Sequence, residues 1–548
     1  MAYQNYPAEE RKDLRDLLRT SAEAFADRVA FFEKRDGVTV SHTYRRYGED
    51  VFALQSALRA RGLAGRRVVI AGANGSAWAT AFLAVAAGLG CAVSASRTTD
   101  AESLARIVTE TEAGAVLCSP DFLPKTESLD PAILRISFAD FPALIEEGSA
   151  PNADGEPDPA DAVEIDPNAP AAIFFTSGAR KGVVLSHRNL CFDVAGFCRM
   201  VGITSEDVFL SVLPIHHAYE TTCGFLVPLY RGAAVAFSEG LRFLTREMKE
   251  YHPTVINCVP YIAEAMYRKV DASIRRHGME RSVLNMIRVT NAIHLEKAAL
   301  AAKRRAFSFV HKSFGGRLRL ILTSGAPADP AVLRGFRNFG ILALQAYTLV
   351  ECSPVAAVNR DRFFNDASAG LSMPDTLVDI SDMQDDGMGE IRCKGDHVML
   401  GYFGDPDATS KVLRDGWFYT GDLGYLDADG FLHVIGRKQN TIVNASGKQI
   451  FPEEIEALLD STKYVREALV RAVPDEDGDD IRLEAVLFPD ADTIAALNDD
   501  NPRRRTVVEM RRAVSEVNEV LPSFKQITAF QISEEPLPKT PSGSLKRE

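Results

Sequence analysis

Apolar and polar positions follow two alternating periods along the first part of the chain. Residues 47–61 carry apolar side chains at helical spacing, and residues 67–72 form a short apolar run that ends in glycine. Residues 76–87 are again helical in pattern, residues 90–93 form a second apolar run, and residues 115–120 repeat the strand-then-turn theme. Helices that alternate with buried strands are typical of parallel sheets covered by helices. The pattern therefore predicts an α/β fold.

This alternation is interrupted once and then changes character near the end. Residues 151–170 are rich in Pro, Asp and Ala, which predicts an exposed connector. A strand at 171–175 follows and the alternation resumes, whereas residues 437–548 combine short strands and helices with many charges. We predict a large N-terminal domain of stacked α/β sheets over residues 1–436 and a small α+β C-terminal domain over the remainder.

A basic, helical stretch over residues 271–314 has two interpretations. A solvated helical face is the favoured one, and contact with a membrane surface or a partner is the alternative. An integral span is not expected, because the longest apolar stretch, residues 80–95, is broken by glycines, and a span needs about 20 apolar residues. The N-terminus has no apolar signal core, so we expect a cytoplasmic protein, with peripheral membrane contact left open.

Composition narrows the classes of partner. The formal net charge is -13 and the pI is about 5.4, which argues against a nucleic-acid-binding protein. At 46% hydrophobic and 25% charged residues, the composition is that of an ordinary globular protein. The eight cysteines are scattered without a C-x-x-C pair and mostly lie in apolar runs, which predicts buried free thiols in a reducing compartment.

Three short motifs carry the candidate chemistry, and the first two have a plain structural alternative. The first places Thr176, Ser177, Gly178 and Lys181 in one loop directly after a strand. Hydroxyls, backbone N–H groups and a lysine suit a polyphosphate, although the spacing is not that of a Walker A loop. Taken alone, the motif is better explained by a plain polar turn.

The second motif has an aromatic residue, Tyr347, followed four residues later by Glu351. The ring could lie on a purine and the carboxylate could hold Mg²⁺, whereas the alternative is a strand end with an exposed glutamate. The third motif contains Asp422, after a Gly turn, and Arg437. An aspartate so placed can accept both hydroxyls of a ribose, and the arginine can bridge sugar and phosphate.

In this order and spacing, the three motifs resemble the adenylate-forming superfamily of acyl-CoA synthetases, luciferases and peptide-synthetase adenylation domains. The resemblance covers essentially the whole chain. Further matching blocks lie at residues 213–220, 323–327, 389–391, 401–402 and 446–456. The Leu-Pro-Ile-His-His block at 213–217, the helical insert and the Phe-Pro-Glu-Glu-Ile-Glu block at 451–456 look most like the long-chain fatty-acid branch.

The resemblance implies a role for each matched residue. The first loop would hold the β- and γ-phosphates of ATP, Glu351 would bind Mg²⁺, Asp422 would bind the ribose, and Arg437 the ribose and phosphate. The nucleotide site would also include residues around the adenine, namely Gly325, Ala326, Pro327, Tyr347 and Thr348.

Other implied roles concern the second substrate and the motion between steps. His217 would stand at the junction of the acyl and thiol tunnels, although a packed loop histidine is the alternative on the residues alone. Gln439 takes the hinge position, and Gly447 would line the pantetheine tunnel of coenzyme A. The implied activity joins a carboxylic acid to AMP, with release of pyrophosphate, and then to the thiol of coenzyme A. An acyl-carrier protein as acceptor, and a non-catalytic acyl or nucleotide binder, stay open as alternatives.

The chain departs from the family pattern at three places. The phosphate loop lacks a Thr-Gly pair, Val350 replaces a threonine, and Ser544 stands where the family has a tail lysine. In an extended tail, Lys546 lies on the same side as Ser544, roughly 7 Å away. We hypothesise that Lys546 substitutes for the missing lysine as a catalytic group.

Overall fold

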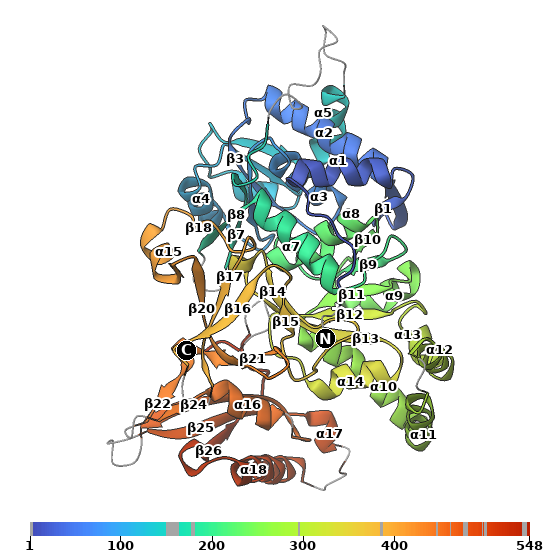
Figure 1. Ribbon diagram of the computed structural model, residues 1–548, viewed down its shortest axis with the longest axis vertical. Helices are drawn as coiled ribbons and strands as arrows, with labels where there is room; N and C mark the ends of the chain where they lie inside the picture. The colour runs from blue at the N-terminus through green and yellow to red at the C-terminus, as the bar shows by residue number, and fades with distance from the viewer. Residues whose placement is uncertain are drawn as a thin grey trace. The chain divides into compact units, whose positions relative to one another are not determined.

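The computed structural model describes residues 4–149, 164–176, 181–293, 296–383, 387–444, 448–460, 462–474, 481–495, 497, 501–539 and 545–547 (Figure 1). The chain forms two compact units. The first comprises Met1–Val378 and Cys393–Phe418, and the second comprises Asp379–Arg392 and Tyr419–Glu548. This division reflects compactness and does not locate a hinge, so the boundary at residue 437 stays a prediction.

The first unit contains a nine-stranded sheet whose middle strands are parallel. β1, β10, β9, β11, β12 and β13 run in one direction, and antiparallel strands close both ends. In spatial order the strands are β15 (Leu371–Ser372), β14 (Val355–Val358), β13 (Leu342–Thr348), β12 (Leu320–Thr323), β11 (Val255–Cys258), β9 (Val208–Ser211), β10 (Ala234–Phe237), β1 (Val29–Arg35) and β2 (Val38–Thr43).

A seven-stranded sheet is the second large sheet of the first unit. β7, β4, β3, β5 and β6 are parallel, and β8 and β18 are antiparallel additions at one edge. In spatial order the strands are β18 (Gly401–Tyr402), β8 (Gly182–Ser186), β7 (Pro170–Phe175), β4 (Cys91–Ala95), β3 (Arg67–Ala71), β5 (Ala115–Cys118) and β6 (Leu134–Ser137). The sequence analysis placed β3, β4, β5 and β7 correctly, because strands buried on both faces read as continuous apolar runs.

Helices cover these sheets. α7 contacts β8 of the seven-stranded sheet and β14 of the nine-stranded sheet, and α10 and α14 lie on β12 and β13. The helices of the first unit are α1 (Leu14–Ala24), α2 (Tyr44–Ala60), α3 (Ser76–Ala86), α4 (Ala101–Glu110), α5 (Phe141–Gly148), α7 (His187–Met200), α8 (Val227–Arg231), α9 (Leu244–Tyr251), α10 (Pro260–Arg276), α11 (Glu280–Asn291), α12 (Glu296–Ala306), α13 (Ser308–Ser313), α14 (Pro330–Asn338) and α15 (Pro406–Val412).

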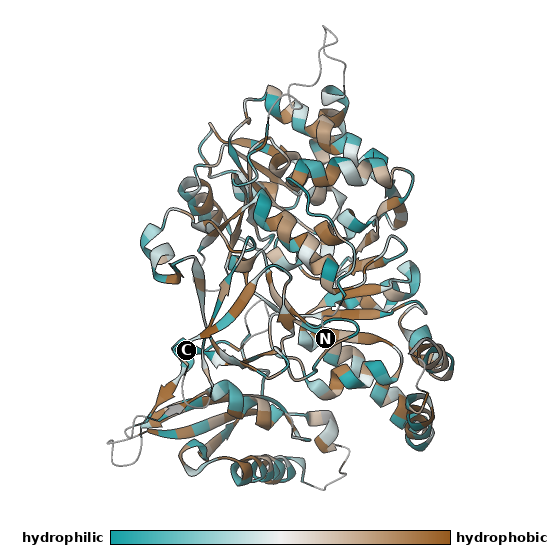
Figure 2. Cartoon of the chain, in the orientation of Figure 1, coloured by the Kyte–Doolittle hydropathy of each residue, from teal (hydrophilic) through white to brown (hydrophobic). Residues whose placement is uncertain are grey.

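The central strands carry the core. Figure 2 shows apolar colouring along β11, β12 and β13, and the residues of these strands pack into one buried cluster with α10 and α14. The basic stretch is helical as predicted, since α10 to α13 cover most of it. All eight cysteines are free and buried, which confirms the predicted buried thiols. In the parts of the chain that the structure describes, the helices fall short of the length and apolarity needed to cross a membrane.

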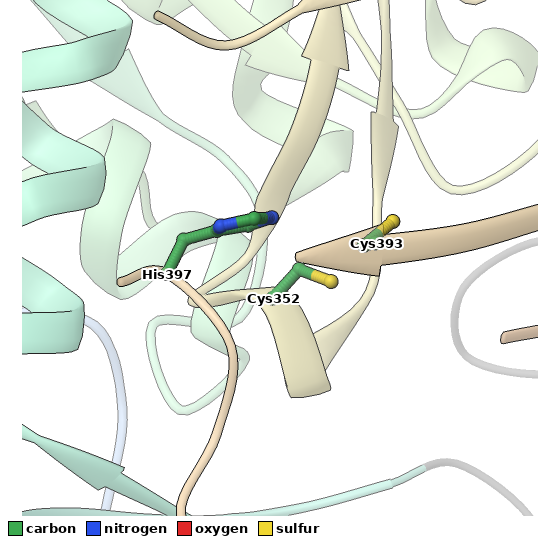
Figure 3. Close-up of side chains that lie close together, drawn as sticks. All are labelled: Cys352, Cys393 and His397. Carbon is green, nitrogen blue, oxygen red and sulfur yellow. The ribbon is translucent and has the colours of Figure 1, made fainter. Parts of the chain in front are cut away.

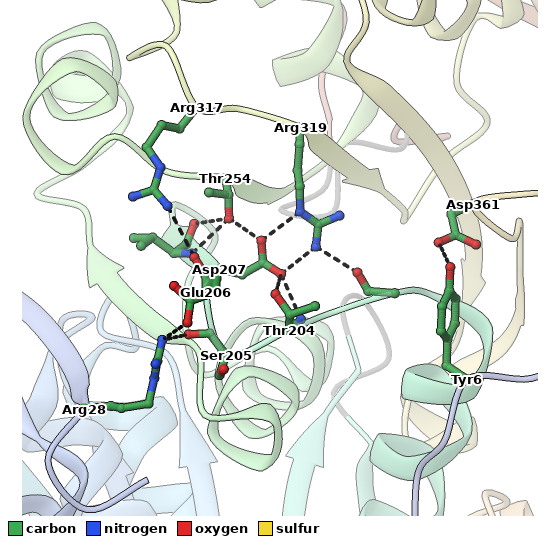
Figure 4. Close-up of polar contacts among 12 residues, drawn as sticks. Tyr6, Arg28, Thr204, Ser205, Glu206, Asp207, Thr254, Arg317, Arg319 and Asp361 are labelled. Atoms are coloured by element: carbon green, nitrogen blue, oxygen red, sulfur yellow. Dashed lines mark hydrogen bonds and ion pairs between the residues drawn. The ribbon is translucent and has the colours of Figure 1, made fainter. Parts of the chain in front are cut away.

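A polar network ties the start of β9 to its neighbours (Figure 4). Asp207 is buried and accepts from Arg319 Nε at 2.8 Å and from Thr254 Oγ1 at 2.6 Å. Burial raises the pKa of Asp207, but the hydrogen bonds and charge of Arg319 outweigh it and hold the pKa below its ordinary value. The ionised carboxylate thus joins the amino ends of β9, β11 and β12, opposite the edge where the candidate residues lie.

The second unit has its own core. Apolar residues of α16, α18 and the three-stranded sheet β24-β25-β26 form it, including Ile455, Leu459 and Met510. A five-stranded sheet has the order β16-β17-β20-β19, with β21 paired to β20. The remaining elements are β16 (Leu377–Ser381), β17 (Gly389–Lys394), β19 (Leu413–Arg414), β20 (Trp417–Leu426), β21 (Leu432–Arg437), β22 (Ile442–Val443), β23 (Gln449–Ile450), α16 (Pro452–Asp460), β24 (Val465–Pro474), β25 (Ile481–Pro489), α17 (Ala491–Ala495), α18 (Pro502–Val520) and β26 (Ile527–Ile532).

Candidate active site

Several predicted site residues gather at one edge of the nine-stranded sheet. Parallel strands place their carboxyl ends at the same edge, and open α/β sheets bind ligands there. His217 follows β9, Gly325 follows β12, and Tyr347 lies near the end of β13. Because β9, β11, β12 and β13 are consecutive parallel neighbours, this edge unites segments that are far apart in the sequence.

The turn after β12 is bound to the end of β13. The hydroxyls of Ser324 and Thr348 form a hydrogen bond, and the Ala328 N–H donates to Gln345 Oε1 at 2.9 Å. Gly325 has a φ of 91°, in the left-handed region that favours glycine. These bonds hold a short polar turn against β13.

Exposure differs across the residues predicted to frame the adenine. Gly325 and Pro327 are exposed, Ala326 is half-buried, and Tyr347 is only 8% exposed. The exposed backbone of the turn therefore offers the accessible surface, and Tyr347 lies mostly beneath it. The structure brings these residues together, while their contact with a nucleotide stays a prediction.

Glu351 is linked to the phosphate loop through Tyr402. Glu351 lies in the 3₁₀ helix η5 (Val350–Cys352) just after β13, and its Oε1 accepts from the Tyr402 hydroxyl at 2.9 Å. The ammonium of Lys181 lies over the Tyr402 ring, 4.6 Å from its centroid. A carboxylate that suits Mg²⁺ and a cation that suits phosphate thus share one aromatic neighbour.

The two ends of the predicted phosphate loop, Thr176 and Lys181, are hydrogen-bonded to each other. The Thr176 N–H donates to the Lys181 carbonyl oxygen at 3.0 Å, and the Lys181 N–H donates to Thr176 Oγ1 at 3.2 Å. Both residues sit where the antiparallel strands β7 and β8 meet. Ser177 and Gly178, the other predicted phosphate contacts, lie outside the described residues.

His217 sits in a half-buried pair of histidines. Its ring centroid is 4.4 Å from that of His216, and its carbonyl oxygen accepts from the Thr221 N–H at 2.9 Å. Burial lowers the pKa of His217 and lowers that of His216 to about 3. Both rings are therefore neutral at pH 7, and each can accept a proton.

Glu220 is a buried carboxyl that the sequence analysis matched only as part of a block. It is 1% exposed and begins the π-helical turn η3 (Glu220–Leu226). Burial raises its pKa to about 8, so the group is mostly protonated at pH 7. Gly224 makes room for it, since a Cβ at that position would lie 2.6 Å from Glu220 Oε1.

Asp422 and Arg437 pair within the second unit. They face each other across β20 and β21, with Arg437 Nε 2.8 Å from Asp422 Oδ1. Asp422 is buried, whereas the Arg437 side chain is 49% exposed. Glu390 organises the same region, because it accepts from the Gly421 N–H at 3.1 Å and from Lys438 Nζ at 2.7 Å. The buried carboxylate is thus oriented by an exposed cation that a ligand can reach.

The tail of the second unit is anchored by two buried glutamates. Arg547 donates to Glu456 at 2.5 Å, and Lys539 donates to Glu467 at 2.9 Å. The Lys546 N–H donates to the Pro538 carbonyl oxygen at 2.9 Å, and the Lys546 side chain is exposed. Neighbouring residues of an extended segment point to opposite sides. Arg547 is directed at Glu456, so an extended tail would place the Lys546 side chain on the other side.

Two predicted positions of the second unit lie outside the described residues. Gly447 and Ser544 are both of this kind, so the predicted register of Ser544 and Lys546 stays a prediction. Sequence reasoning missed Tyr402 as a contact of Glu351 and missed the Arg547–Glu456 pair. Tyr402 carried a signal, because it lies in a matched block, but the pairing partners are too distant in sequence to be inferred from spacing.

Comparisons with known proteins agree with this arrangement. The profile of the family described as AMP-binding enzyme matches residues 18–403. Long-chain-fatty-acid–CoA ligase 5 of Rattus norvegicus is 29% identical over 59% of the chain, and the chain spans about half of that relative, 50% of its length. Long-chain-fatty-acid–CoA ligase FadD15 of Mycobacterium bovis is 27% identical over 81% of the chain and 77% of the relative.

Solved structures share the fold. The anthranilate CoA ligase AuaEII in complex with anthranoyl-AMP has a TM-score of 0.76 at 18% identity, over 99% of this chain and 96% of that one. A fatty acyl CoA synthetase of Mycobacterium tuberculosis has a TM-score of 0.67 at 21% identity, over 98% of this chain and 97% of that one. A large sheet-rich N-terminal part and a smaller C-terminal part, as predicted, are common to this group.

Proposed function

Because the chain belongs to the AMP-binding enzyme family, as its match over residues 18–403 shows, we propose that it is an acid–thiol ligase. It activates a carboxylic acid with ATP and then transfers the acyl group to coenzyme A. The observation that carries the proposal is the link between Glu351, Tyr402 and Lys181, which begins just after β13. That link supplies one group suited to a divalent cation and one suited to phosphate.

The proposed acid is a medium- or long-chain fatty acid. The relatives that support this substrate class are long-chain-fatty-acid–CoA ligases from rat and from Mycobacterium bovis, at 29% and 27% identity. The block at residues 213–217, which includes His217, the helical insert and the block at residues 451–456 are the parts of the chain that favour this branch. A protonated glutamic acid in an apolar setting, as at Glu220, is compatible with a neutral acyl chain nearby.

In the first step, the acid carboxylate attacks the α-phosphorus of ATP. The new bond joins the acyl oxygen to phosphorus, and pyrophosphate leaves with the electron pair of the broken bond. Lys181 and Thr176 would bind the leaving phosphates, and Asp422 and Arg437 would orient the ribose. Mg²⁺, held by Glu351, would offset phosphate charge. Lys546 would stabilise the charge that develops on the reacting oxygens.

In the second step, the thiol sulfur attacks the acyl carbonyl and AMP leaves. The products are the acyl thioester and AMP, and the thiol proton must go to a base. His217 is neutral at pH 7 because burial lowers its pKa, so it can take that proton as well as separate the acyl and thiol paths. Coenzyme A is the proposed acceptor, and the thiol of an acyl-carrier protein is the competing one.

We further propose that the enzyme works in the cytoplasm. The eight buried free cysteines support a reducing compartment. A peripheral membrane contact through the basic helices α11 and α12 is compatible with a fatty substrate, and their exposed apolar side chains include Leu284, Val289 and Leu300.

ATP–pyrophosphate exchange with a panel of fatty acids of increasing chain length tests this function. We expect exchange that depends on the acid and on Mg²⁺ and that is greatest with a medium or long chain. Formation of the thioester is then measured with coenzyme A and with a phosphopantetheine-loaded carrier protein. Tight nucleotide binding without exchange for any acid would instead identify a non-catalytic binder, and thioester formation only with the carrier protein would exclude coenzyme A.

A further inference from the structure

Three ligand-type side chains meet in the interior of the first unit (Figure 3). Cys352 ends the 3₁₀ helix η5, Cys393 lies on β17, and His397 lies in the segment between β17 and β18. Their sulfur and ring nitrogen atoms all lie within 4.8 Å of one another. Each of the three residues is 0% exposed. Two thiols and an imidazole from three separate segments therefore converge on one buried point.

The histidine has no hydrogen-bond partner at this point. Among the described residues, neither Nδ1 nor Nε2 of His397 has one, although both atoms are buried. Buried polar atoms in folded proteins are nearly always hydrogen-bonded, so each exception needs an explanation. A ring nitrogen that lacks a protein partner and faces two sulfur atoms is suited to bind a metal ion.

The backbone around the histidine is shaped for its ring. Gly395 has a φ of 150°, and a Cβ at that position would lie 3.0 Å from His397 Nδ1. The Phe192 ring stacks with that of His397 at a centroid distance of 6.3 Å. The imidazole is thus held in place from two directions without using its nitrogen atoms.

We propose that Cys352, Cys393 and His397 bind one Zn²⁺ ion. In zinc sites, Zn–S bonds are about 2.3 Å and Zn–N bonds about 2.0–2.1 Å, so ligand atoms lie roughly 3.4–4 Å apart. The three ligand atoms, which lie within 4.8 Å of one another, would move closer to reach that spacing when the ion binds. Binding releases the two thiol protons to solvent, and no oxidation or reduction takes place.

Charge balance favours zinc over other soft ions. Two thiolates and a neutral imidazole carry two negative charges, which Zn²⁺ neutralises, whereas Cu⁺ would leave a buried net charge. Among the described residues, the cluster offers three side-chain ligands, so a small molecule such as water would occupy the fourth position of a tetrahedral ion.

A bound ion would stabilise the two segments that position Glu351 and Tyr402. Cys352 is the residue after Glu351, and His397 lies two residues before Met399, whose N–H donates to the Glu351 carbonyl oxygen at 2.9 Å. The strand that follows, β18, contains Tyr402. Zinc would thus stabilise the arrangement of Glu351 and Tyr402 without taking part in the reaction.

The test measures metal content without any substrate, so its outcome is independent of the proposed activity. The full chain is stripped with a chelator under reducing conditions, given Zn²⁺ or Cu⁺ in separate arms, exchanged into metal-free buffer and analysed by mass spectrometry of the metal. We expect one zinc per chain, a higher melting temperature with zinc than without, and at least a tenfold loss of bound zinc in Cys393→Ser and in His397→Asn.

Cys118→Ser is the matched control, because Cys118 is another fully buried free cysteine, on β5. It should retain zinc like the unmodified chain. Should the ligand variants fail to fold, Co²⁺ in the unmodified chain keeps the test decisive, since thiolate ligation gives a near-ultraviolet charge-transfer band. The proposal is overturned by zinc-free protein after reconstitution, by a cobalt spectrum without that band, by zinc retained in both variants, or by retention of Cu⁺ alone.

Discussion

The sheet edge of the first unit and the tail of the second unit hold their candidate residues by different means. At the edge, parallel strands position the Gly325 turn and Tyr347, and the hydrogen bond between Ser324 and Thr348 only refines the placement. In the tail, Lys546 depends on its neighbour Arg547, whose pairing with Glu456 anchors a few residues. The first placement is a property of the fold, and the second depends on a few ion pairs and hydrogen bonds within the tail.

This difference bears on one departure from the family pattern, the one predicted in the tail. Residues placed by strands match the pattern at Tyr347, Glu351 and Asp422, although Val350 beside Glu351 departs from it. A tail segment held by side-chain pairs and a few backbone bonds can accept a shifted lysine without disturbing a core. The comparison predicts that substitutions at the edge change the rate of adenylation and leave stability unchanged. In the tail, one substitution should change the rate and a different one should change the stability.

The largest effect is expected for Glu351→Gln. Glutamine keeps an acceptor for the Tyr402 hydroxyl but removes the negative charge proposed to bind Mg²⁺. Adenylation should fall on the order of 10³-fold, while the melting temperature stays unchanged. ATP–pyrophosphate exchange over a range of Mg²⁺ concentrations measures this, with the exposed Glu102→Gln as control. Exchange equal to that of the control would remove Glu351 from the metal site.

Lys546→Ala tests the chemical role of the tail. Loss of an exposed cation proposed to stabilise the reacting oxygens should reduce adenylation about 100-fold. The thioester step, started from preformed acyl-AMP, should change by less than about threefold because that charge is no longer needed. Lys539→Ala is the matched control, since Lys539 pairs with Glu467. Unchanged pyrophosphate release in Lys546→Ala would refute the substitution hypothesis.

Arg547→Ala tests the anchor. Burial raises the pKa of Glu456 to about 7, against 4.5 ordinarily, and Arg547 lowers it. A carboxyl with a raised pKa adds stability below pH 4.5 that is lost as the pH rises through about 7. Without Arg547, no arginine charge offsets the buried, ionised Glu456 carboxylate. The free energy of unfolding should therefore fall by about 2 kcal/mol at pH 8, where Glu456 is mostly ionised, and by less at pH 5.

Urea unfolding of the full chain at both pH values measures the Arg547 effect, and Lys546→Ala serves as the control because its side chain is exposed. An equal loss at pH 5 and pH 8 would show that the Glu456 charge does not depend on Arg547.

The smallest effect is expected for Tyr402→Phe. The change removes the hydrogen bond to Glu351 but keeps an aromatic face for Lys181. Losing this hydrogen bond should cost about 1 kcal/mol of MgATP binding. That corresponds to a roughly fivefold higher KM for MgATP in the exchange assay. The control is Tyr419→Phe, in the second unit. A KM unaltered by Tyr402→Phe would mean that the Tyr402 bond does not orient Glu351 for the metal.

Local periodicity predicted much of the fold. The structure has α2 at Tyr44–Ala60 and α3 at Ser76–Ala86 where helices were predicted at residues 47–61 and 76–87, because one apolar face per helix is visible in the sequence. The sequence predicted the fold class but not the order of the strands, because strand order depends on contacts between distant segments. The order of β9, β11, β12 and β13, which creates the shared edge, could not be inferred from local pattern.

The candidate site was predicted to a similar extent. The motifs gave Tyr347, Glu351 and Arg437 as residues, but not the bond between Glu351 and Tyr402, which joins segments unrelated by spacing. The cysteines were predicted as buried thiols, and this is confirmed. The cluster of Cys352, Cys393 and His397 could not be predicted, because the sequence has no C-x-x-C pair or regular His spacing that would indicate it.

Photolabelling with 2-azido-ATP tests most directly the central claim, that the nucleotide binds at the carboxyl edge of the nine-stranded sheet. After proteolysis, mass spectrometry should find the label in peptides that contain Gly325 to Pro327 or Tyr347, and excess ATP should suppress it. Saturable labelling confined to peptides distant from this edge, such as those of α4 or α5, would contradict the account.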